Sequence, residues 1–340
     1  MRKHRVLFGL LLLGLVARPT APTVAAVFVR ASARVGRSIS AALPARLDGA
    51  RLLAALQRLP SRPFISHVAR VPLTLRGPDG AALTRRLHPQ GMSLDARQQR
   101  IYLTAVELRG VLGIGGGRAL LFELDFRGRQ LRAVQLSREG DVFHPGGIDH
   151  DAATGQLVTP IAAYYPGGTA QLVAITPATL KSQRLHRVAD HLGFTVALGA
   201  GRYLAGSWDS TSLYVLGAGH AQPLCELANP TPGGTAHQDG QALVPGVAVL
   251  GGYSPTWPRT FSGLDIVRVR AGSCTLDVLR SLRWSISSSL LSAQGRSPLE
   301  NATFLWAGPR GAVYLLSAAD DQHSTAAGGA ALDLYRLEAR

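Results

Sequence analysis

Cysteine is scarce in this chain of 340 residues, and the few motifs that depend on it are absent. It has only two cysteines and no C-x-x-C pair. This excludes zinc–thiolate sites and thioredoxin-like redox sites. The G-x-S-x-G motif is absent as well, which excludes an ordinary α/β-hydrolase. After residue 62 no long segment repeats apolar residues at the helical period of 3.6, so helical folds are also excluded.

A basic face for nucleic acid is lacking, although the net charge is +15. Residues 1–62 hold 11 Lys or Arg and one acid, whereas residues 63–340 hold 25 basic and 20 acidic residues. The excess therefore lies in the N-terminal segment. No basic stripe with interleaved aromatic residues is present. We predict no nucleic-acid partner.

The N-terminus lacks an apolar run of the about 20 residues that span a bilayer. A charged Arg2–Arg5 segment precedes 12 apolar residues at Val6–Ala17, and small residues follow at Val24–Ala26. This pattern predicts a cleaved signal peptide over residues 1–26 and a secreted or periplasmic product. An uncleaved signal anchor, the only membrane attachment considered, is disfavoured because Arg18 and Pro19 interrupt the run.

Two further segments follow. Residues 27–63 form an Ala/Arg-rich linker with a short amphipathic helix that ends at Pro60. Residues 64–340 form the folded domain, in which β-branched and aromatic residues alternate between Gly, Pro and Asp turns. This alternation predicts strands throughout.

A short motif recurs in which a histidine stands up to three residues ahead of a glycine and begins an apolar run. Its copies start at His88, His144, His191 and His237, with spacings of 56, 47 and 46 residues. A fifth start, Ser297–Asn301, carries Glu300 instead. A repeat of this length with only strand content is typical of β-propeller blades. The histidines would then converge on the central channel.

The chain ends on a strand, Leu332–Leu337, that has no return strand after it. The segment Ile65–Leu75 precedes the first histidine motif and could supply the missing strand, which closes the ring. Residues 64–340 at about 45 per blade predict about six blades. Five to seven blades are compatible with the sequence, and our expectation is an all-β propeller of six four-stranded blades.

Several ordered motifs resemble an uncharacterised domain family of predicted six-bladed β-propellers. The motifs are His88–Gly91, Gly140–Asp149, Pro160–Pro166, Asp190–Gly193, Gly206–Trp208 and His237–Asp239. The resemblance covers roughly residues 70–340. It departs at Gly240, where the family pattern has a cysteine. The resemblance implies a fold but no activity.

The histidine set is the main candidate site. Imidazole is a common transition-metal ligand and a common general base. We assign His144 and His191 as candidate catalytic residues. The candidate ligands of a divalent ion (Mn, Zn or Ca) are His88, His144, His191, His237 and Glu300. The alternative is that each ring is structural and bonds to the backbone of a neighbouring blade.

A substrate would contact further polar and aromatic residues near these histidines. The candidates are Gln90, Asp149, Tyr164, Trp208, Gln238 and Asp239. Three of them have a plainer alternative: Asp149 lies in Asp149–Asp151, which could be a turn, and the two aromatic residues could pack between blades. Asp320–His323 is expected to be a solvated loop.

Two functions from different classes remain open. One is a hydrolase or lyase that takes a small molecule at the channel mouth, with a metal or a histidine base. The alternative is a non-catalytic ligand- or protein-binding propeller with structural histidines. Histidine side chains within about 5 Å of one point would favour the first, and rings turned to separate backbone carbonyls the second. Cys225 and Cys274 either pair between adjacent blades or stay as two thiols.

Overall fold

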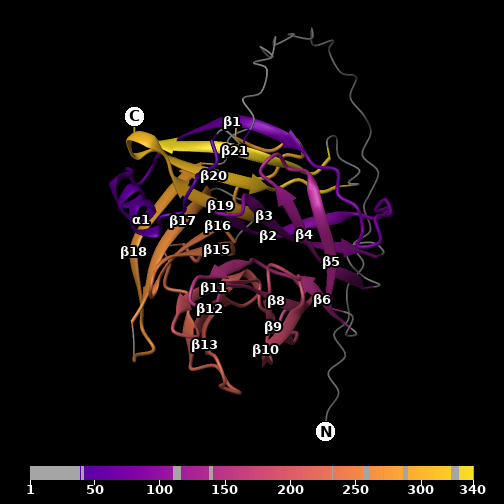
Figure 1. The fold of residues 1–340 in the computed structure, drawn as a ribbon. Coiled ribbons are helices and arrows are strands. Elements are labelled where there is room, and N and C mark those ends of the chain that lie inside the picture. The colour runs from indigo at the N-terminus through magenta and orange to yellow at the C-terminus, as the bar shows by residue number, and fades with distance from the viewer. Residues whose placement is uncertain are drawn as a thin grey trace, which may run out of the picture. The chain divides into compact units, whose positions relative to one another are not determined.

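The alternating segments from Phe64 onward form strands, as predicted. The computed structural model describes residues 39, 42–109, 116–137, 141–231, 233–255, 261–270, 272–285, 290–322 and 329–339. In these residues the strands form five antiparallel sheets, which are the blades of a propeller (Figure 1). The expected all-β propeller is confirmed.

Each blade is numbered from the strand nearest the channel outward. Blade 1 consists of β2 (Leu87–Asp95), β3 (Arg100–Leu108), β4 (Gly117–Asp125) and β5 (Gln130–Ser137). Blade 2 consists of β6 (Val142–Pro145) and β7 (Asp149–Asp151), which both pair with β8 (Gln156–Ala163), and then β9 (Ala170–Ile175) and β10 (Ser182–Val188).

The remaining blades follow the same order. Blade 3 consists of β11 (Phe194–Gly199), β12 (Arg202–Gly206), β13 (Ser212–Gly217) and β14 (Cys225–Ala228). Blade 4 consists of β15 (Ala236–Val244), β16 (Val247–Tyr253), β17 (Phe261–Val269) and β18 (Leu276–Ser285). Blade 5 consists of β19 (Ala302–Ala307), β20 (Val313–Ala318), β21 (Ala331–Glu338) and β1 (Phe64–Pro72). Short 3₁₀ turns lie at η3 (Trp208–Ser210) and η4 (Pro309–Gly311).

The expected number of six blades is wrong, because the described residues form five. The error came from dividing the length by about 45 residues per blade. Several blades are longer than that: β15 and β19 begin 66 residues apart, at Ala236 and Ala302, because a long connection follows β18. The five motif starts, counted directly, correspond one to one with the five blades.

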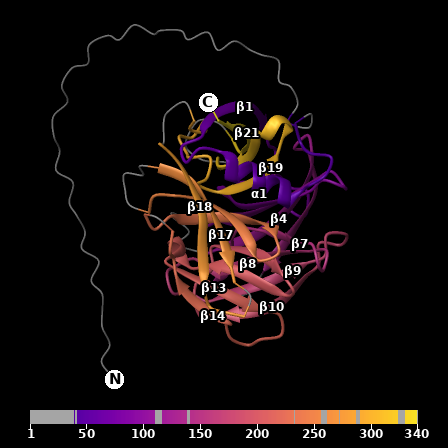
Figure 2. The same ribbon diagram turned by 90° about the vertical axis from the view of Figure 1, so that its left-hand side faces the viewer.

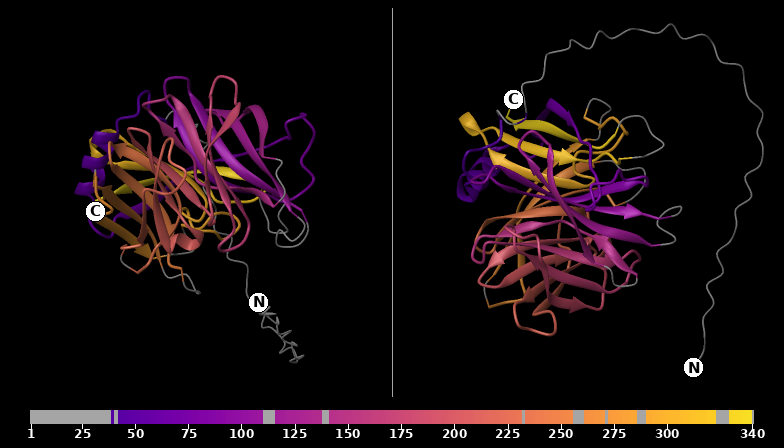
Figure 3. Two further views of the ribbon diagram at one scale, coloured as in Figure 1. Left: turned by 90° about the horizontal axis from the view of Figure 1, so that it is seen from below. Right: turned by 45° about the vertical axis from the view of Figure 1, so that its right-hand side comes forward.

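The ring closes as predicted, by pairing of the first strand with the last. β1 runs antiparallel to β21, from Phe64 opposite Glu338 to Pro72 opposite Ala331. The two strands, indigo and yellow, lie side by side in Figures 1 and 3. Blade 5 therefore contains both ends of the folded domain.

The core lies between neighbouring blades, so both faces of a blade are buried. In β3, every residue after Arg100 is buried, including the large side chain of Tyr102. Each fully buried aliphatic side chain of this strand, such as Ile101 or Leu103, contributes about 1.5–3 kcal/mol. Continuous apolar runs in the sequence thus reflect sheets packed on two sides.

A disulfide joins Cys225 to Cys274, with the Cα atoms 5.5 Å apart. Cys225 begins β14 and Cys274 lies just before β18, so the bond connects the outer strands of blades 3 and 4. Pairing, one of the two alternatives drawn from the sequence, is thereby confirmed.

The predicted helix before Pro60 is α1 (Gly49–Arg58) (Figure 2). It begins because the Asp48 carboxylate accepts a hydrogen bond from the Arg51 N–H at 2.9 Å. Its buried face, Leu52, Ala55 and Leu56, packs on apolar side chains of blades 4 and 5. No helix within the described residues is long and apolar enough to cross a membrane. The signal peptide predicted at 1–26 lies outside them.

Candidate functional site

The starts of the innermost strands surround a cavity of about 330 Å³ at one end of the channel, here called the upper cavity. All five blades contribute to its lining. Nine of the eleven predicted site residues line it: His88, Gln90, His144, Tyr164, His191, Trp208, His237, Gln238 and Glu300. The repeated motif therefore brings distant segments of the chain to one place.

The other two predicted residues, Asp149 and Asp239, do not line this cavity. Both are buried on the channel axis, where they bind backbone N–H groups. The Asp149 carboxylate of β7 accepts from Ala197 of β11 and Ala242 of β15, both at 3.0 Å. Burial raises the pKa of Asp149 to about 7, although these bonds oppose it.

Asp239 of β15 acts in the same way on the other blades. Its carboxylate accepts from the N–H groups of Met92 in β2 and Thr303 in β19, both at 2.9 Å. Burial raises its pKa well above the usual value. Together the two carboxylates link all five innermost strands. We call Asp149 and Asp239 the carboxylate plug.

Glycine completes the closure of the channel. A Cβ on Gly91 would lie 2.5 Å from the Cα of Gly147, and a Cβ on Gly147 would lie 2.5 Å from a carboxylate oxygen of Asp239. Only glycine permits this approach of β2, blade 2 and the plug. The glycines after His88, His144 and His237 thus permit close packing, because a Cβ on Gly91, Gly146 or Gly240 would lie less than 3.0 Å from a neighbouring atom.

The Asp149–Asp151 segment also forms the turn that the sequence allowed. Asp151 accepts from the N–H of Ala153 at 3.0 Å, and its carbonyl accepts from Gly155. The two carboxylates of this motif are therefore engaged with the protein backbone.

His88 belongs to a charged network. Its Nδ1 lies 2.5 Å from a carboxylate oxygen of Asp321, which also bonds to Arg86 and Arg296. Burial opposes ionisation of Asp321, yet the hydrogen bond from His88 and the two arginines hold its pKa at about 2. Arg296 lies 3.7 Å from Glu300.

The expectation that Asp320–His323 is a solvated loop is wrong for its first three residues, because Gln322 is also buried and its amide bonds to the backbone of Leu75. Asp320 and Asp321 are fully buried. Burial of these charges is possible because Arg70 forms an ion pair with Asp320, and the charged network around His88 neutralises Asp321. His323 lies outside the described residues.

His191 has a defined tautomer. Its Nδ1 lies 2.8 Å from the carbonyl oxygen of Ala163, which can only accept, so Nδ1 carries the proton and donates it. Burial lowers the pKa of His191. The ring is therefore neutral near pH 7, with Nε2 as its basic atom.

Aromatic rings form one wall of the cavity. His144 stacks on Tyr164 with ring centroids 4.4 Å apart, and His191 meets Trp208 edge-on at 4.8 Å. Tyr164 remains 36% exposed, in the loop between β8 and β9. Packing between blades does not bury it. Burial lowers the pKa of His144 well below 6.5.

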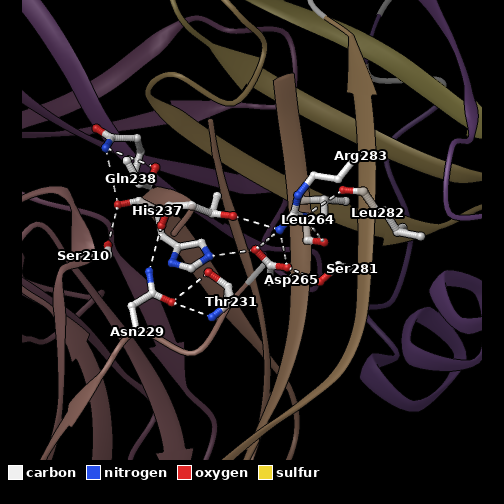
Figure 4. A network of polar contacts seen from close by, with 12 residues as sticks. Ser210, Asn229, Thr231, His237, Gln238, Leu264, Asp265, Ser281, Leu282 and Arg283 are labelled. Atoms are coloured by element: carbon white, nitrogen blue, oxygen red, sulfur yellow. Dashed lines mark hydrogen bonds and ion pairs between the residues drawn. The ribbon is translucent and has the colours of Figure 1, made fainter. Parts of the chain in front are cut away.

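His237 is bound to Asp265 (Figure 4). Its Nε2 lies 3.0 Å from the carboxylate, and both side chains are fully buried. Arg283 and Ser281 of β18 also donate to Asp265. Burial opposes ionisation of Asp265, but His237 and Arg283 lower its pKa. His237 is thus fixed within blade 4.

The predicted metal ligands do not form a metal site here. His88, His191 and His237 each engage a separate acceptor, and the rings of His144 and His191 are 6.0 Å apart. In the described part of the chain, no three or more His, Cys, Asp or Glu side chains are grouped to hold an ion. We therefore derive no step through a metal.

Several lining residues were missed by sequence reasoning: Arg86, Asp209, Arg296 and Asn301. Each lies within four positions of a predicted residue, so proximity to the motif was the available signal. Asp321 gave no such signal, because the chain brings it to His88 from 233 residues away.

Residues 48–222 match the model of a family described as a family of unknown function (DUF6454). No curated protein matches the sequence.

Similar solved structures have low identity. A luciferin-regenerating enzyme has 12% identity and a TM-score of 0.44, covering 81% of this chain and 95% of that chain. An exo-β-1,3-galactanase from Clostridium thermocellum has 8% identity and a TM-score of 0.45, covering 78% and 62%. The β-propeller domain of the Trilobed protease from Pyrococcus furiosus has 9% identity and a TM-score of 0.31, covering 74% and 68%. These similarities concern the fold alone.

Proposed function

Because the chain belongs to a family of unknown function (DUF6454), its activity must be argued from the site, and we propose that it binds a small, sugar-like molecule in the upper cavity. The observation that carries this proposal is the lining itself: five blades place nine predicted side chains around about 330 Å³. That volume lies within the range of small-molecule sites.

The chemistry of the lining supports a polyhydroxylated ring. Tyr164 and Trp208 offer aromatic faces, on which the apolar side of such a ring stacks. Gln90 and Gln238 offer amides, which both donate to and accept from hydroxyl groups. The charged lining residues Arg86, Arg296, Asp209 and Glu300 balance one another, which favours a neutral ligand over a strong anion.

A titration of the full chain with neutral hexoses, uronic acids and polyols tests this proposal, with calorimetry as the readout. We expect Tyr164→Ala to weaken binding about tenfold, since one stacked ring contributes about 1.4 kcal/mol. Tyr165→Ala is the matched control, because its ring is 52% exposed and does not line the cavity. Equal affinities of both variants, or no saturable binding by any of these compounds, would refute the proposal.

A second candidate function is a metal-free hydrolase or lyase with His191 as general base. The fixed Nδ1–H of His191 and its lowered pKa favour this role, since Nε2 is then ready to accept a proton from the ligand or from water. The ligand found by titration would be followed by mass spectrometry for chemical change. His191→Gln should stop turnover and leave binding within a few-fold. If the wild-type protein leaves the ligand chemically unchanged, the enzyme function is refuted and only the binding function remains.

We place this activity outside the cytoplasm, in the periplasm or the medium. The N-terminal apolar run supports export, and the Cys225–Cys274 disulfide suits an oxidising compartment.

A further inference from the structure

A second cavity, the lower cavity, lies at the opposite ends of the innermost strands and has a volume of about 560 Å³. All five blades and the segment that leads into α1 line it. Representative lining residues are Leu47, Leu52, Leu94, Ala197, Leu243 and Trp306. No function assigned above uses this space.

The N-terminal segment forms one wall of this cavity. Leu52 of α1 is buried against blades 4 and 5, and the Trp306 indole N–H donates to the carbonyl of Ala42 at 3.0 Å. Ile39 is buried in the core between blades 5 and 1, together with Leu94 and Phe304. The segment is therefore docked on one side of the channel axis, which leaves the cavity beside it.

The two cavities are separated by the carboxylate plug and the glycine contacts at the axis. Asp149 faces the lower cavity, whereas none of the residues of the plug lines the upper one. A ligand in one cavity therefore does not reach the histidines of the other.

The lining of the lower cavity is mostly apolar. Three of its buried polar side chains are engaged, and the buried Ser93 hydroxyl has no hydrogen-bond partner among the described residues. Gln241 both donates to and accepts from the backbone of Leu305. Asp149 binds two backbone N–H groups, and Asp151 closes its turn. Water in such a space finds few partners, so its replacement by an apolar molecule is favourable.

The charged lining residues are three acids and one arginine: Asp48, Asp149, Asp151 and Arg202. Asp48 is exposed and caps α1, and Arg202 is half-buried. This set gives no net attraction for an anionic head group. A long-chain carboxylate is therefore disfavoured relative to its uncharged counterpart.

We propose that the lower cavity binds an uncharged apolar small molecule, of the class of long-chain alcohols or polycyclic lipids. Its volume falls within the range of about 300–1,000 Å³ of small-molecule sites, and its apolar walls with a few polar groups have the usual composition of such sites. The proposal does not depend on the function of the upper cavity.

Fluorescence titration of the full chain with Nile red, a neutral dye that brightens in apolar surroundings, tests the proposal. We expect saturable binding at one site and displacement by dodecanol, with dodecanoate at least about tenfold weaker because its charge must be desolvated. Absence of saturable binding overturns the proposal. Equal displacement by dodecanoate overturns the assignment of an uncharged ligand.

Two half-buried lining residues locate the dye. Val244→Asp and Leu47→Asp should each raise the dissociation constant about tenfold or more, because each sets a carboxylate against the ligand. Val68→Asp, a change of the same kind at a 47% exposed position outside the cavity, should leave it unchanged. Circular dichroism identifies the variants that fold. Two positions are tested so that the experiment still gives a result if one variant does not fold. Folded Val244→Asp or Leu47→Asp protein with wild-type affinity overturns the proposal.

Discussion

The two ends of the central channel are built from the inner strands of the same five blades, yet their cavities differ in chemistry. The upper cavity is lined mostly by histidines, amides, aromatic rings and charged side chains, and the lower cavity mostly by apolar side chains. The strands begin with the repeated polar motif and continue into apolar alternation. The two ends therefore differ because each inner strand starts with polar residues at the upper cavity and ends with apolar residues at the lower cavity.

The carboxylate plug maintains this difference. Two buried acids bind the innermost strands to one another at the midpoint, in a place where a channel could otherwise join the cavities. The plug is polar because five crowded strands leave backbone N–H groups without ladder partners, and such groups need acceptors when buried.

Removal of the plug should have the largest effect. Asp239→Ala leaves the buried N–H groups of Met92, Thr303 and Gly240 without this acceptor, which should reduce the free energy of unfolding by about 3–5 kcal/mol. Urea unfolding measures it. Asp277→Ala, which removes a partly exposed carboxylate on β18 that pairs with Arg270, is the control and should change little. Equal stability of the two variants would contradict the role of the plug.

The two ends should respond oppositely to pH. His144 has a pKa well below 6.5, so the unfolded chain takes up a proton that the folded protein refuses, and stability falls as the pH drops below about 6.5. Asp149 has a pKa raised from 3.8 to about 7, so the folded protein holds a proton that the unfolded chain releases. The contribution of Asp149 to the free energy of unfolding is therefore present below pH 3.8 and is lost as the pH rises to about 7.

For each residue, the unfolding free energy changes by at most about 1.4 kcal/mol per pH unit. Unfolding free energies across this range would separate them. His144→Gln should remove the loss on the acid side, and Asp149→Asn the loss toward neutral pH. Parallel curves for the wild type and both variants would show that neither residue titrates as described.

Metal removal should have the smallest effect. The upper histidines engage separate protein acceptors, so EDTA should leave both the melting temperature and ligand binding unchanged. Mass spectrometry of the untreated protein provides the matching measurement of metal content. A near-stoichiometric metal whose loss lowers the melting temperature would restore the metal hypothesis for the upper cavity.

Most of the fold could be predicted because its signals are local. Strand alternation, turn residues and the five histidine or acid starts each depend on a few neighbouring positions. The predicted number of blades was wrong only because it was calculated from an average blade length instead of from the number of histidine or acid motif starts. The long connection before Ala302 misled that average, since connection lengths follow no periodic pattern.

The site was predictable where the motif repeats and not where contacts are long-range. A carboxylate beside a glycine, as in Asp239-Gly240, has the same local sequence whether it binds a ligand or backbone N–H groups. Asp321 reaches His88 only because blade 5 lies next to blade 1, which the sequence near Asp321 does not encode.

Closure of the ring by β1 and β21 has a kinetic consequence. Phe64 pairs with Glu338, so 274 residues separate the two partners, and blade 5 cannot obtain its outer strand until the rest of the domain has been synthesised. Pairings of such long range form slowly, because the loop entropy is lost before the contacts compensate for it. The first strand of this propeller should therefore wait longest for its neighbour, and the newly made chain should carry an unpaired strand edge until the ring is complete.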